Sequence, residues 1–363
     1  MTTLHELHKL GQSAWLDYIR SDLFTTGEMS ALLERGVRGM TSNPTIFEQA
    51  IGHSDLYRAK ISALASRGKS AQEIYDALVF ADIKAAAQSL LPLYEATDGE
   101  DGYVSLEVPP AFCDNHNQTE AEAHRLVQLL NLPNLMIKVP ATPEGLVAFE
   151  NLTADGVSVN VTLMFTLSDY EDVANAYLCG LSRRLKNGQA LRTVSSVASV
   201  FVSRIDAAVE SLKGDALPDL LKGSVAIANA QRIYQSFQEI FEGDAFAELR
   251  ANSARPQRPL FASTGTKNAA YRDVLYVETL IGPHTVNTMP PATLRAFLDH
   301  GVVKRTLDEN PAHTKEILDA CASASIDLDA IGRDLKKKGL DAFTKSFDSL
   351  METIETARTS SLS

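Results

Sequence analysis

The strongest constraint on the fold of this chain is a repeated alternation of short apolar, β-rich runs with longer stretches of helical spacing. Eight such runs occur, and most are continuously hydrophobic rather than alternating with polar residues. Continuous hydrophobicity is typical of parallel strands that are buried on both faces of a sheet. The runs cover residues 13–19, 36–43, 103–108, 135–139, 157–163, 193–202 and 259–263, and the last lies within 276–288.

The stretches between these runs carry helix signals. Ser70 with Glu73, and Thr25 with Glu28, have the spacing of a capping box at the start of a helix, and Gly36 supplies a stop after the second of these helices. Strand–helix alternation repeated eight times predicts an α/β fold, namely a (β/α)8 TIM barrel with additional helices.

Nothing along the chain marks a domain boundary, because it has no Pro-, Gly- or Ser-rich linker, no internal repeat and no low-complexity tract. We therefore expect one domain over residues 1–363, with decoration at an N-terminal turn (4–10) and in helical stretches at 54–95 and 212–249. A C-terminal helix is also expected, since apolar residues recur there at helical spacing. Packing is the expected role of this stripe, which comprises Leu340, Phe343, Phe347, Leu350 and Ile354.

The charge balance restricts the partners. The chain has 46 acidic and 34 basic side chains, a net charge of −12. Nucleic acids and anionic membranes attract proteins with an excess of Lys and Arg, so we expect neither as a partner, and positive charge for a small anion must be local. No run approaches the length of a membrane span, and the N-terminus lacks the pattern of a signal peptide.

Cysteine and histidine spacing argues against metals and disulfides. Cys113, Cys179 and Cys321 are scattered without a CxxC pair, which favours reduced thiols and a cytoplasmic location. His116 and His124 make no credible metal set, and no dinucleotide fingerprint occurs. We therefore expect no metal and no cofactor.

Lys138 lies inside the run LMIKVP, the most apolar setting of any lysine in the chain. Its position in a barrel strand, close to the C-terminal end where such barrels carry their active sites, favours a reactive amine over a lysine that snorkels to the surface. Desolvation disfavours an ammonium ion, and a neutral amine attacks a ketone to form a Schiff base. We interpret Lys138 as a nucleophile.

Two carboxylates interrupt other apolar runs: Asp17 in WLDYI and Glu107 in VSLEV. A lone carboxylate at a strand end is more often a helix cap or a solvated residue. Two of them near the C-terminal ends of strands, together with an inner lysine, fit general acid–base catalysis better.

Two asparagines extend this group. Asn43 in TSNPT is either a turn residue before proline or a pocket residue, and the sequence leaves both open. Asn160, with Thr162 in VNVT, lies inside a β-branched strand, where a pocket-facing role is favoured over a satisfied core polar group.

An anion site is indicated where two later strands end, with SVFVSR at 199–204 and STGTKN at 263–268. Barrel enzymes commonly bind phosphate in the loops after late strands, through backbone N–H groups, hydroxyls and a cation. An ordinary polar loop at 263–268 and a surface position for Arg204 are the alternatives.

Together these segments resemble the transaldolase family, which belongs to the Schiff-base aldolases, and in particular its longer bacterial form, over almost the whole chain. Each motif alone is weak, but their order, with Asp17 upstream, is highly specific. The resemblance is carried by TSNPTIF at 41–47, IKVPAT at 137–142, GVSVNVTL at 156–163, ASTGTKN at 262–268, and YVETLIGP at 276–283 through NTMP at 287–290.

The resemblance implies a transferase that needs neither metal nor cofactor and works in the non-oxidative pentose phosphate pathway. It would move a dihydroxyacetone unit from sedoheptulose 7-phosphate or fructose 6-phosphate to glyceraldehyde 3-phosphate or erythrose 4-phosphate. The unit would be carried as a Schiff base on Lys138. Asp17 would take the proton of the C4 hydroxyl, and Glu107 would act through a water placed by Thr162.

The resemblance also implies a set of substrate-binding residues. Asn43 and Asn160 would hold the dihydroxyacetone hydroxyls with help from Ser199, and Phe201 would line the pocket. The phosphate would be bound by Arg204, Ser263 and Lys267. Shorter transaldolases carry Ser-x-Arg-Asn at the last of these positions, whereas here the cation comes two positions later and is a lysine, a point charge without a bidentate fork.

Two alternatives remain at the level of the sequence. A fructose-6-phosphate aldolase would use the same lysine but release free dihydroxyacetone, and Asp17, Asn43 and Glu107 favour transfer over this reaction. An isomerase or binder of sugar phosphates on the same barrel would use Lys138 only electrostatically. The sequence leaves open whether the chain is a monomer or a homodimer.

Overall fold

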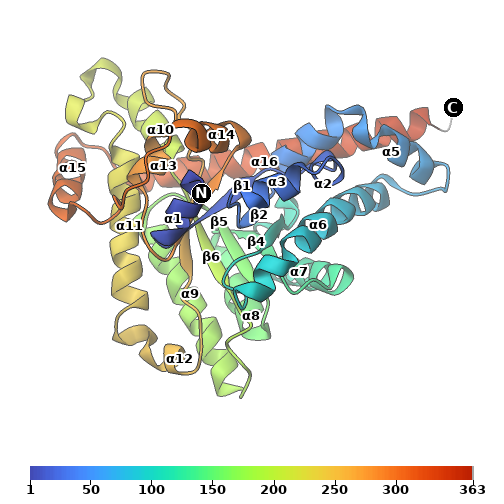
Figure 1. Ribbon diagram of the computed structural model, residues 1–363, viewed down its shortest axis with the longest axis horizontal. Helices are drawn as coiled ribbons and strands as arrows, with labels where there is room; N and C mark the ends of the chain where they lie inside the picture. Colours follow the sequence, from blue (N-terminus) through green and yellow to red (C-terminus); the bar gives the residue numbers. More distant parts are fainter. Residues whose placement is uncertain (362–363) are drawn as a thin grey trace.

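The computed structural model describes residues 1–361 and shows a closed barrel of eight parallel strands, paired in chain order (Figure 1). Each predicted run overlaps one strand, so the predicted (β/α)8 TIM barrel is confirmed. The strands are β1 (Gln12–Asp17), β2 (Gly39–Thr41), β3 (Val104–Glu107), β4 (Leu135–Pro140), β5 (Val159–Met164), β6 (Ser196–Phe201), β7 (Arg258–Ala262) and β8 (Thr285–Met289).

Helices surround the barrel and add to it at the C-terminus. The α-helices are α1 (Thr3–Lys9), α2 (Asp22–Thr25), α3 (Glu28–Glu34), α4 (Pro44–Phe47), α5 (Arg58–Ala65), α6 (Ala71–Ala96), α7 (His116–Leu130), α8 (Pro143–Asp155), α9 (Leu167–Lys186), α10 (Ser203–Lys213), α11 (Val225–Phe241), α12 (Ala247–Ala251), α13 (Leu275–Thr279), α14 (Pro291–His300), α15 (Pro311–Ser323) and α16 (Leu328–Ser360). Short 3-10 or π turns are η1 (Glu48–Gly52), η2 (Asp55–Tyr57), η3 (Pro110–Phe112), η4 (Gly214–Ala216), η5 (Asp219–Leu221) and η6 (Asp244–Phe246).

The two predicted capping boxes have different outcomes. At the start of α6, the Ser70 hydroxyl accepts a hydrogen bond from the Glu73 N–H at 3.3 Å, and the Glu73 carboxylate accepts one from the Ser70 N–H at 2.9 Å, as predicted. The prediction for Thr25 is wrong, because Thr25 is the last residue of α2. Gly27, with a φ of 84°, turns the chain sharply and becomes the N-cap of α3.

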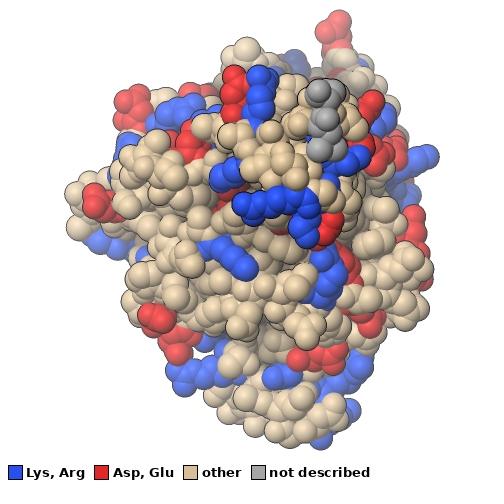
Figure 2. Space-filling model, turned by 90° about the vertical axis from the view of Figure 1, so that its right-hand side faces the viewer, with Lys and Arg blue, Asp and Glu red and all other residues tan. Residues whose placement is uncertain are grey.

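The strands are buried on both sides, as their continuous hydrophobicity predicted. All six residues of β4 and of β6 are buried between the barrel interior and the surrounding helices. Among residues 1–361, no helix combines the length and apolar character that a membrane crossing requires. On the face shown in Figure 2, basic and acidic side chains are interspersed with uncharged surface.

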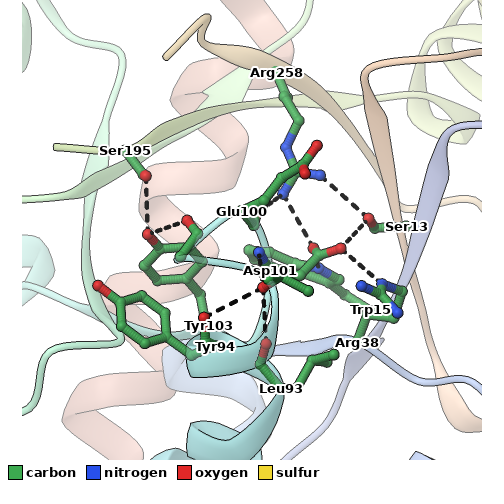
Figure 3. Close-up of polar contacts among 12 residues, drawn as sticks. Ser13, Trp15, Arg38, Leu93, Tyr94, Glu100, Asp101, Tyr103, Ser195 and Arg258 are labelled. Atoms are coloured by element: carbon green, nitrogen blue, oxygen red, sulfur yellow. Dashed lines mark hydrogen bonds and ion pairs between the residues drawn. The ribbon is translucent and has the colours of Figure 1, made fainter. Parts of the chain in front are cut away.

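A buried charge cluster holds the amino ends of several strands together (Figure 3). Asp101, in the loop before β3, accepts hydrogen bonds from Ser13 Oγ at 2.6 Å and from Trp15 Nε1 at 3.2 Å, both on β1. It also pairs with Arg38 Nε at 2.7 Å, just before β2, and with Arg258 Nη2 at 3.1 Å, on β7. One carboxylate thus joins β1, β7 and the segment before β2 at the end of the barrel opposite to the carboxyl ends of the strands.

The charge on Asp101 is maintained by its partners. Burial alone raises the pKa of a carboxyl group, but Arg258 and Arg38 bring the pKa of Asp101 below its ordinary value of 3.8. A buried charge is tolerated only when it is paired, so each member of this cluster depends on the others.

The substitution Asp101→Asn is expected to lower the free energy of unfolding by about 3–5 kcal/mol, because it leaves the buried Arg258 and the partly buried Arg38 without their counter-charge. Chemical denaturation measures this directly. Asp98→Asn, in the same loop but with 66% of its side chain exposed, is the matched control. An exposed ion pair contributes about 0–1 kcal/mol, so this control should remain close to the unsubstituted protein.

The same cluster predicts a pH dependence. Because the folded pKa of Asp101 lies below its ordinary 3.8, its contribution to stability is present above that pH and is lost as the pH falls through the folded value. The stability difference between the unsubstituted protein and Asp101→Asn should therefore shrink in acid. A difference that stays constant down to pH values of about 3 contradicts a charged Asp101.

Candidate active site

The predicted site residues gather at the carboxyl ends of the strands, around a cavity of about 210 Å³. This is the end of a (β/α)8 barrel at which active sites form. The predicted residues that line it are Asp17, Asn43, Lys138, Thr162, Ser199, Phe201, Arg204, Ser263 and Lys267. The other two, Glu107 and Asn160, lie directly behind this lining, as described below.

Lys138 is the buried amine of the cavity, with only 4% of its surface exposed. Strand register places it between Glu107 on β3 and Asn160 on β5. Its Nζ donates a hydrogen bond to the Ser42 carbonyl at 3.1 Å and lies 3.3 Å from Glu107 Oε2. The second distance is that of an ion pair without hydrogen-bond geometry, and Glu107 Oε2 has no hydrogen-bond partner among residues 1–361. The Lys138 amine therefore lies beside a carboxylate without donating a hydrogen bond to it.

Burial changes the acid–base properties of both carboxylates. It raises the pKa of Glu107 above the ordinary 4.5, because the opposing effect of Lys138 is smaller. Burial likewise raises the pKa of Asp17 above 3.8, although Lys138 and a hydrogen bond from Thr41 lower it. Carboxyl groups with raised pKa values can accept and return protons nearer to neutral pH, which suits general acid–base catalysis.

The two asparagines have different placements. Asn43 is the N-cap of α4, where its Oδ1 accepts a hydrogen bond from the Ile46 N–H at 2.9 Å, and it also lines the cavity. Asn43 is therefore both a turn residue before proline and a residue of the cavity lining. Asn160 is fully buried, donates to Ser105 Oγ at 3.0 Å and accepts from Ser199 Oγ at 2.7 Å. It is a satisfied core amide that orients Ser199, which does line the cavity.

The remaining predicted residues form a cationic side of the cavity. Arg204 lies in the first turn of α10, with its guanidinium carbon 5.1 Å from the centroid of the Phe201 ring. Burial lowers the pKa of Arg204 below its ordinary value, although Asp17 raises it. Ser263 lies 3.0 Å from Ser203, hydroxyl to hydroxyl, and Lys267 is exposed at the rim. Two cations, hydroxyls and a helix N-terminus suit an anion.

Sequence reasoning missed several lining residues. Thr41 Oγ1 donates a hydrogen bond to Asp17 Oδ1 at 2.7 Å and lies 2.7 Å from Thr288 Oγ1. Both threonines stand in motifs that were already singled out, and a hydroxyl at the end of a strand was the available signal. The lining residues not predicted are Thr41, Thr45, Ile46, Ala262, Gly265, Thr288, Pro290 and Phe343.

The long helix α16 lies across the carboxyl end of the barrel, with contacts to β5 and α10 as well as to α4, α5 and α6 (Figure 1). The predicted packing role of its apolar stripe holds for Leu350 and Ile354, which are fully buried. It is incomplete for Phe343, which lines the cavity. Two glycines allow this close approach: a Cβ on Gly332 would lie 2.3 Å from Thr166 Cγ2, and one on Gly339 2.8 Å from Leu163 Cδ2.

Fold and cavity together define a (β/α)8-barrel enzyme with a buried amine, two carboxylates and a cationic side in one site. A family model described as transaldolase/fructose-6-phosphate aldolase matches residues 14–354.

Curated relatives agree with this match over the full length. The chain is 42% identical to a transaldolase of Trichodesmium erythraeum over 371 residues, with 98% of each chain covered. It is also 42% identical to a transaldolase of Neisseria gonorrhoeae over 351 residues, covering 97% of this chain and 99% of the relative. For a transaldolase of Thiobacillus denitrificans the values are 42% over 362 residues, with 98% and 100% covered. The chain therefore belongs to the transaldolase/fructose-6-phosphate aldolase family, as its motifs predicted.

The close packing of α16 against the barrel can be tested with Gly332→Ala. In a helix this substitution normally stabilises by about 0.5–1 kcal/mol. Here the new methyl group would overlap Thr166, so we expect a net loss of about 1–2 kcal/mol and lower transaldolase activity, because α16 must move away from the barrel. Ser349→Ala, at an exposed position of the same helix, should change stability by less than about 0.5 kcal/mol. A gain in stability for Gly332→Ala contradicts the close contact.

Proposed function

We propose that this transaldolase, a transferase, moves a dihydroxyacetone unit from sedoheptulose 7-phosphate or fructose 6-phosphate to glyceraldehyde 3-phosphate or erythrose 4-phosphate. The unit is carried as a Schiff base on Lys138. The observation that carries this proposal is the placement of a buried amine 3.3 Å from one carboxylate, in a cavity that a second carboxylate lines. An amine so placed is a nucleophile with acid–base partners within reach.

Formation of the Schiff base begins when Lys138 Nζ attacks C2 of the ketose. The resulting carbinolamine then loses its hydroxyl as water, for which a proton must be supplied. Glu107 is suited to this step because its raised pKa allows it to carry a proton beside Nζ. Thr162 Oγ1 is buried and, within residues 1–361, has no hydrogen-bond partner, which supports its role in holding a water that relays this proton.

Bond cleavage uses the second carboxylate. Asp17 takes the proton of the C4 hydroxyl, C4 becomes an aldehyde, and the electron pair of the C3–C4 bond moves into the Schiff base to form an enamine. The aldehyde product leaves, and the enamine C3 attacks the acceptor aldehyde while Asp17 returns its proton to the new hydroxyl. Water then adds to C2 and the C2–N bond breaks, which releases the new ketose and frees Lys138. Asn43 and Ser199 contact the dihydroxyacetone hydroxyls from the cavity lining, with Asn160 behind Ser199.

The cationic side of the cavity supports binding of the phosphate. Arg204, Ser263 and Lys267 all line it, and α10 begins there with its positive end. Phe201 lines the same cavity, and its ring packs against the Arg204 guanidinium. A local cluster of this kind binds a small phosphate ester even though the whole chain carries a net charge of −12.

The wider setting is part of the same proposal. We infer a single domain over residues 1–363 that works in the cytoplasm, in the non-oxidative pentose phosphate pathway, as a monomer or a homodimer. Sugar phosphates are its partners, and nucleic acids and membranes are not. The excess of acidic residues, 46 against 34 basic ones, supports the exclusion of polyanions.

The covalent step can be tested by borohydride reduction in the presence of fructose 6-phosphate. We expect a stable three-carbon or six-carbon adduct, located on Lys138 by peptide mass. Lys138→Arg should form no adduct and lose turnover completely, because a guanidinium group stays protonated and cannot act as the amine. Lys338→Arg, at an exposed position of α16 outside the cavity lining, is the control for substitution of a lysine and should still form the adduct.

Each alternative makes a different prediction for these assays. Activity retained in Lys138→Arg, or no adduct on Lys138, would favour an isomerase or binder without a covalent step. Steady release of free dihydroxyacetone from fructose 6-phosphate alone, over many turnovers, would favour the aldolase instead of the transferase.

The acid side of the pH–rate profile should respond to Thr41→Val. The hydroxyl of Thr41 donates to Asp17 and so stabilises the charged carboxylate, and its removal raises the pKa of Asp17 further. Since Asp17 acts as the base in cleavage, the acid limb should move upward by about one pH unit. Thr288→Val is the control. The single proton of the Thr41 hydroxyl goes to Asp17, so Thr288 faces the oxygen of that hydroxyl and not the carboxylate, and its replacement should move the limb less. A limb that is unmoved or moves downward contradicts this role for Thr41.

A further inference from the structure

We propose that Phe343, on α16, is a further active-site residue whose ring shields Lys138 from water. The ring thereby decides how the covalent intermediate partitions between an aldehyde acceptor and hydrolysis. This inference rests on the Schiff base proposed above and concerns a residue outside the barrel and outside the motifs that identify the family.

The position of the ring carries the inference. Phe343 is 4% exposed and lines the cavity, and its ring centroid lies 5.9 Å from Lys138 Nζ. Nζ also has polar neighbours, the Ser42 carbonyl and the Glu107 carboxylate. An apolar ring at this distance occupies space beside the amine without offering water a hydrogen bond.

The helix around Phe343 is fixed on both sides. Two turns before it, Lys336 Nζ donates a hydrogen bond to the Ala141 carbonyl at 2.7 Å and pairs with Asp169 at 2.5 Å. One turn after it, Ser346 Oγ lies 2.9 Å from Thr45 Oγ1, and Thr45 itself lines the cavity. Because α16 is anchored to the loop after β4 and to the first turns of α9 and α4, which follow β5 and β2, the ring keeps its place over the amine.

The chemistry explains why such a shield matters. After the C3–C4 bond breaks, the enamine on Lys138 has two possible fates. In transfer, C3 attacks an aldehyde carbon, and a proton goes to the new hydroxyl. In hydrolysis, C3 takes a proton instead, water adds to C2, and the C2–N bond breaks to release dihydroxyacetone and the free amine. Transfer also ends with hydrolysis, because water must add to C2 and break the C2–N bond to release the new ketose. The two routes differ in timing: water that reaches the intermediate before C3 has attacked the acceptor releases dihydroxyacetone instead. Exclusion of water at that stage therefore favours transfer.

The test compares Phe343→Leu with Phe347→Leu. Phe347 lies one turn further along α16, where its ring packs edge-on against Tyr75. It lines a small separate cavity beside Asn43 and Glu107 and not the cavity around Lys138, so it tests whether the loss of any ring of α16 near the site has the same effect. We measure free dihydroxyacetone and transferred product with fructose 6-phosphate and erythrose 4-phosphate, and the borohydride adduct on Lys138. Phe343→Leu should raise the ratio of hydrolysis to transfer by about fivefold or more, since a water can reach the intermediate. The control should keep the ratio of the unsubstituted enzyme, and all three proteins should form the adduct.

Phe343→Tyr provides a second measurement that keeps the volume of the ring. Its hydroxyl offers a hydrogen bond to water, so the ratio should rise here too, and this variant decides the matter where Phe343→Leu does not fold. The inference is overturned if the folded variants stay within about twofold of the unsubstituted enzyme, or if Phe347→Leu changes the ratio equally. Absence of an adduct in the unsubstituted enzyme would overturn the proposed function itself, which is a different result.

Discussion

Closure of eight parallel strands into one barrel is the constraint on which the site depends. Because all strands run in the same direction, their carboxyl ends share one rim, and residues far apart in the chain become neighbours. Pairing in register places Glu107, Lys138 and Asn160 side by side on three successive strands. A single slip in register would turn Lys138 out of the barrel, so the hydrogen bonds between strands also fix the chemistry.

The two ends of the barrel use buried charge in opposite ways. At the amino ends, two arginines more than offset burial and bring the pKa of Asp101 below its ordinary value. At the carboxyl ends, one lysine serves two carboxylates and cannot offset burial for either, so the pKa values of Asp17 and Glu107 are raised. The same balance of desolvation and pairing therefore stabilises one end and prepares the other for proton transfer.

The barrel was predictable because buried parallel strands have a continuous apolar pattern, and Lys138 stood out as the charge inside such a pattern. Polar residues at strand ends and the resemblance to the transaldolase family together predicted nine of the seventeen residues that line the cavity. Contacts between distant segments were not predictable in this way. The apolar residues of α16 have the same spacing whether they pack or line a cavity, so the sequence pattern could not distinguish Phe343 from its packing neighbours. Thr25 failed as a cap because Gly27 decides where the chain turns.

The position of α16 in the chain has a consequence for biosynthesis. All eight strands precede this helix, so a growing polypeptide can pair its last strand before the covering helix has been made. Lys138 and its carboxylate neighbours are then assembled in a barrel whose mouth is still open. The ribosome thus completes the nucleophile well before it completes the cover, and the finished enzyme arises only when the final helix docks against Gly332 and Gly339.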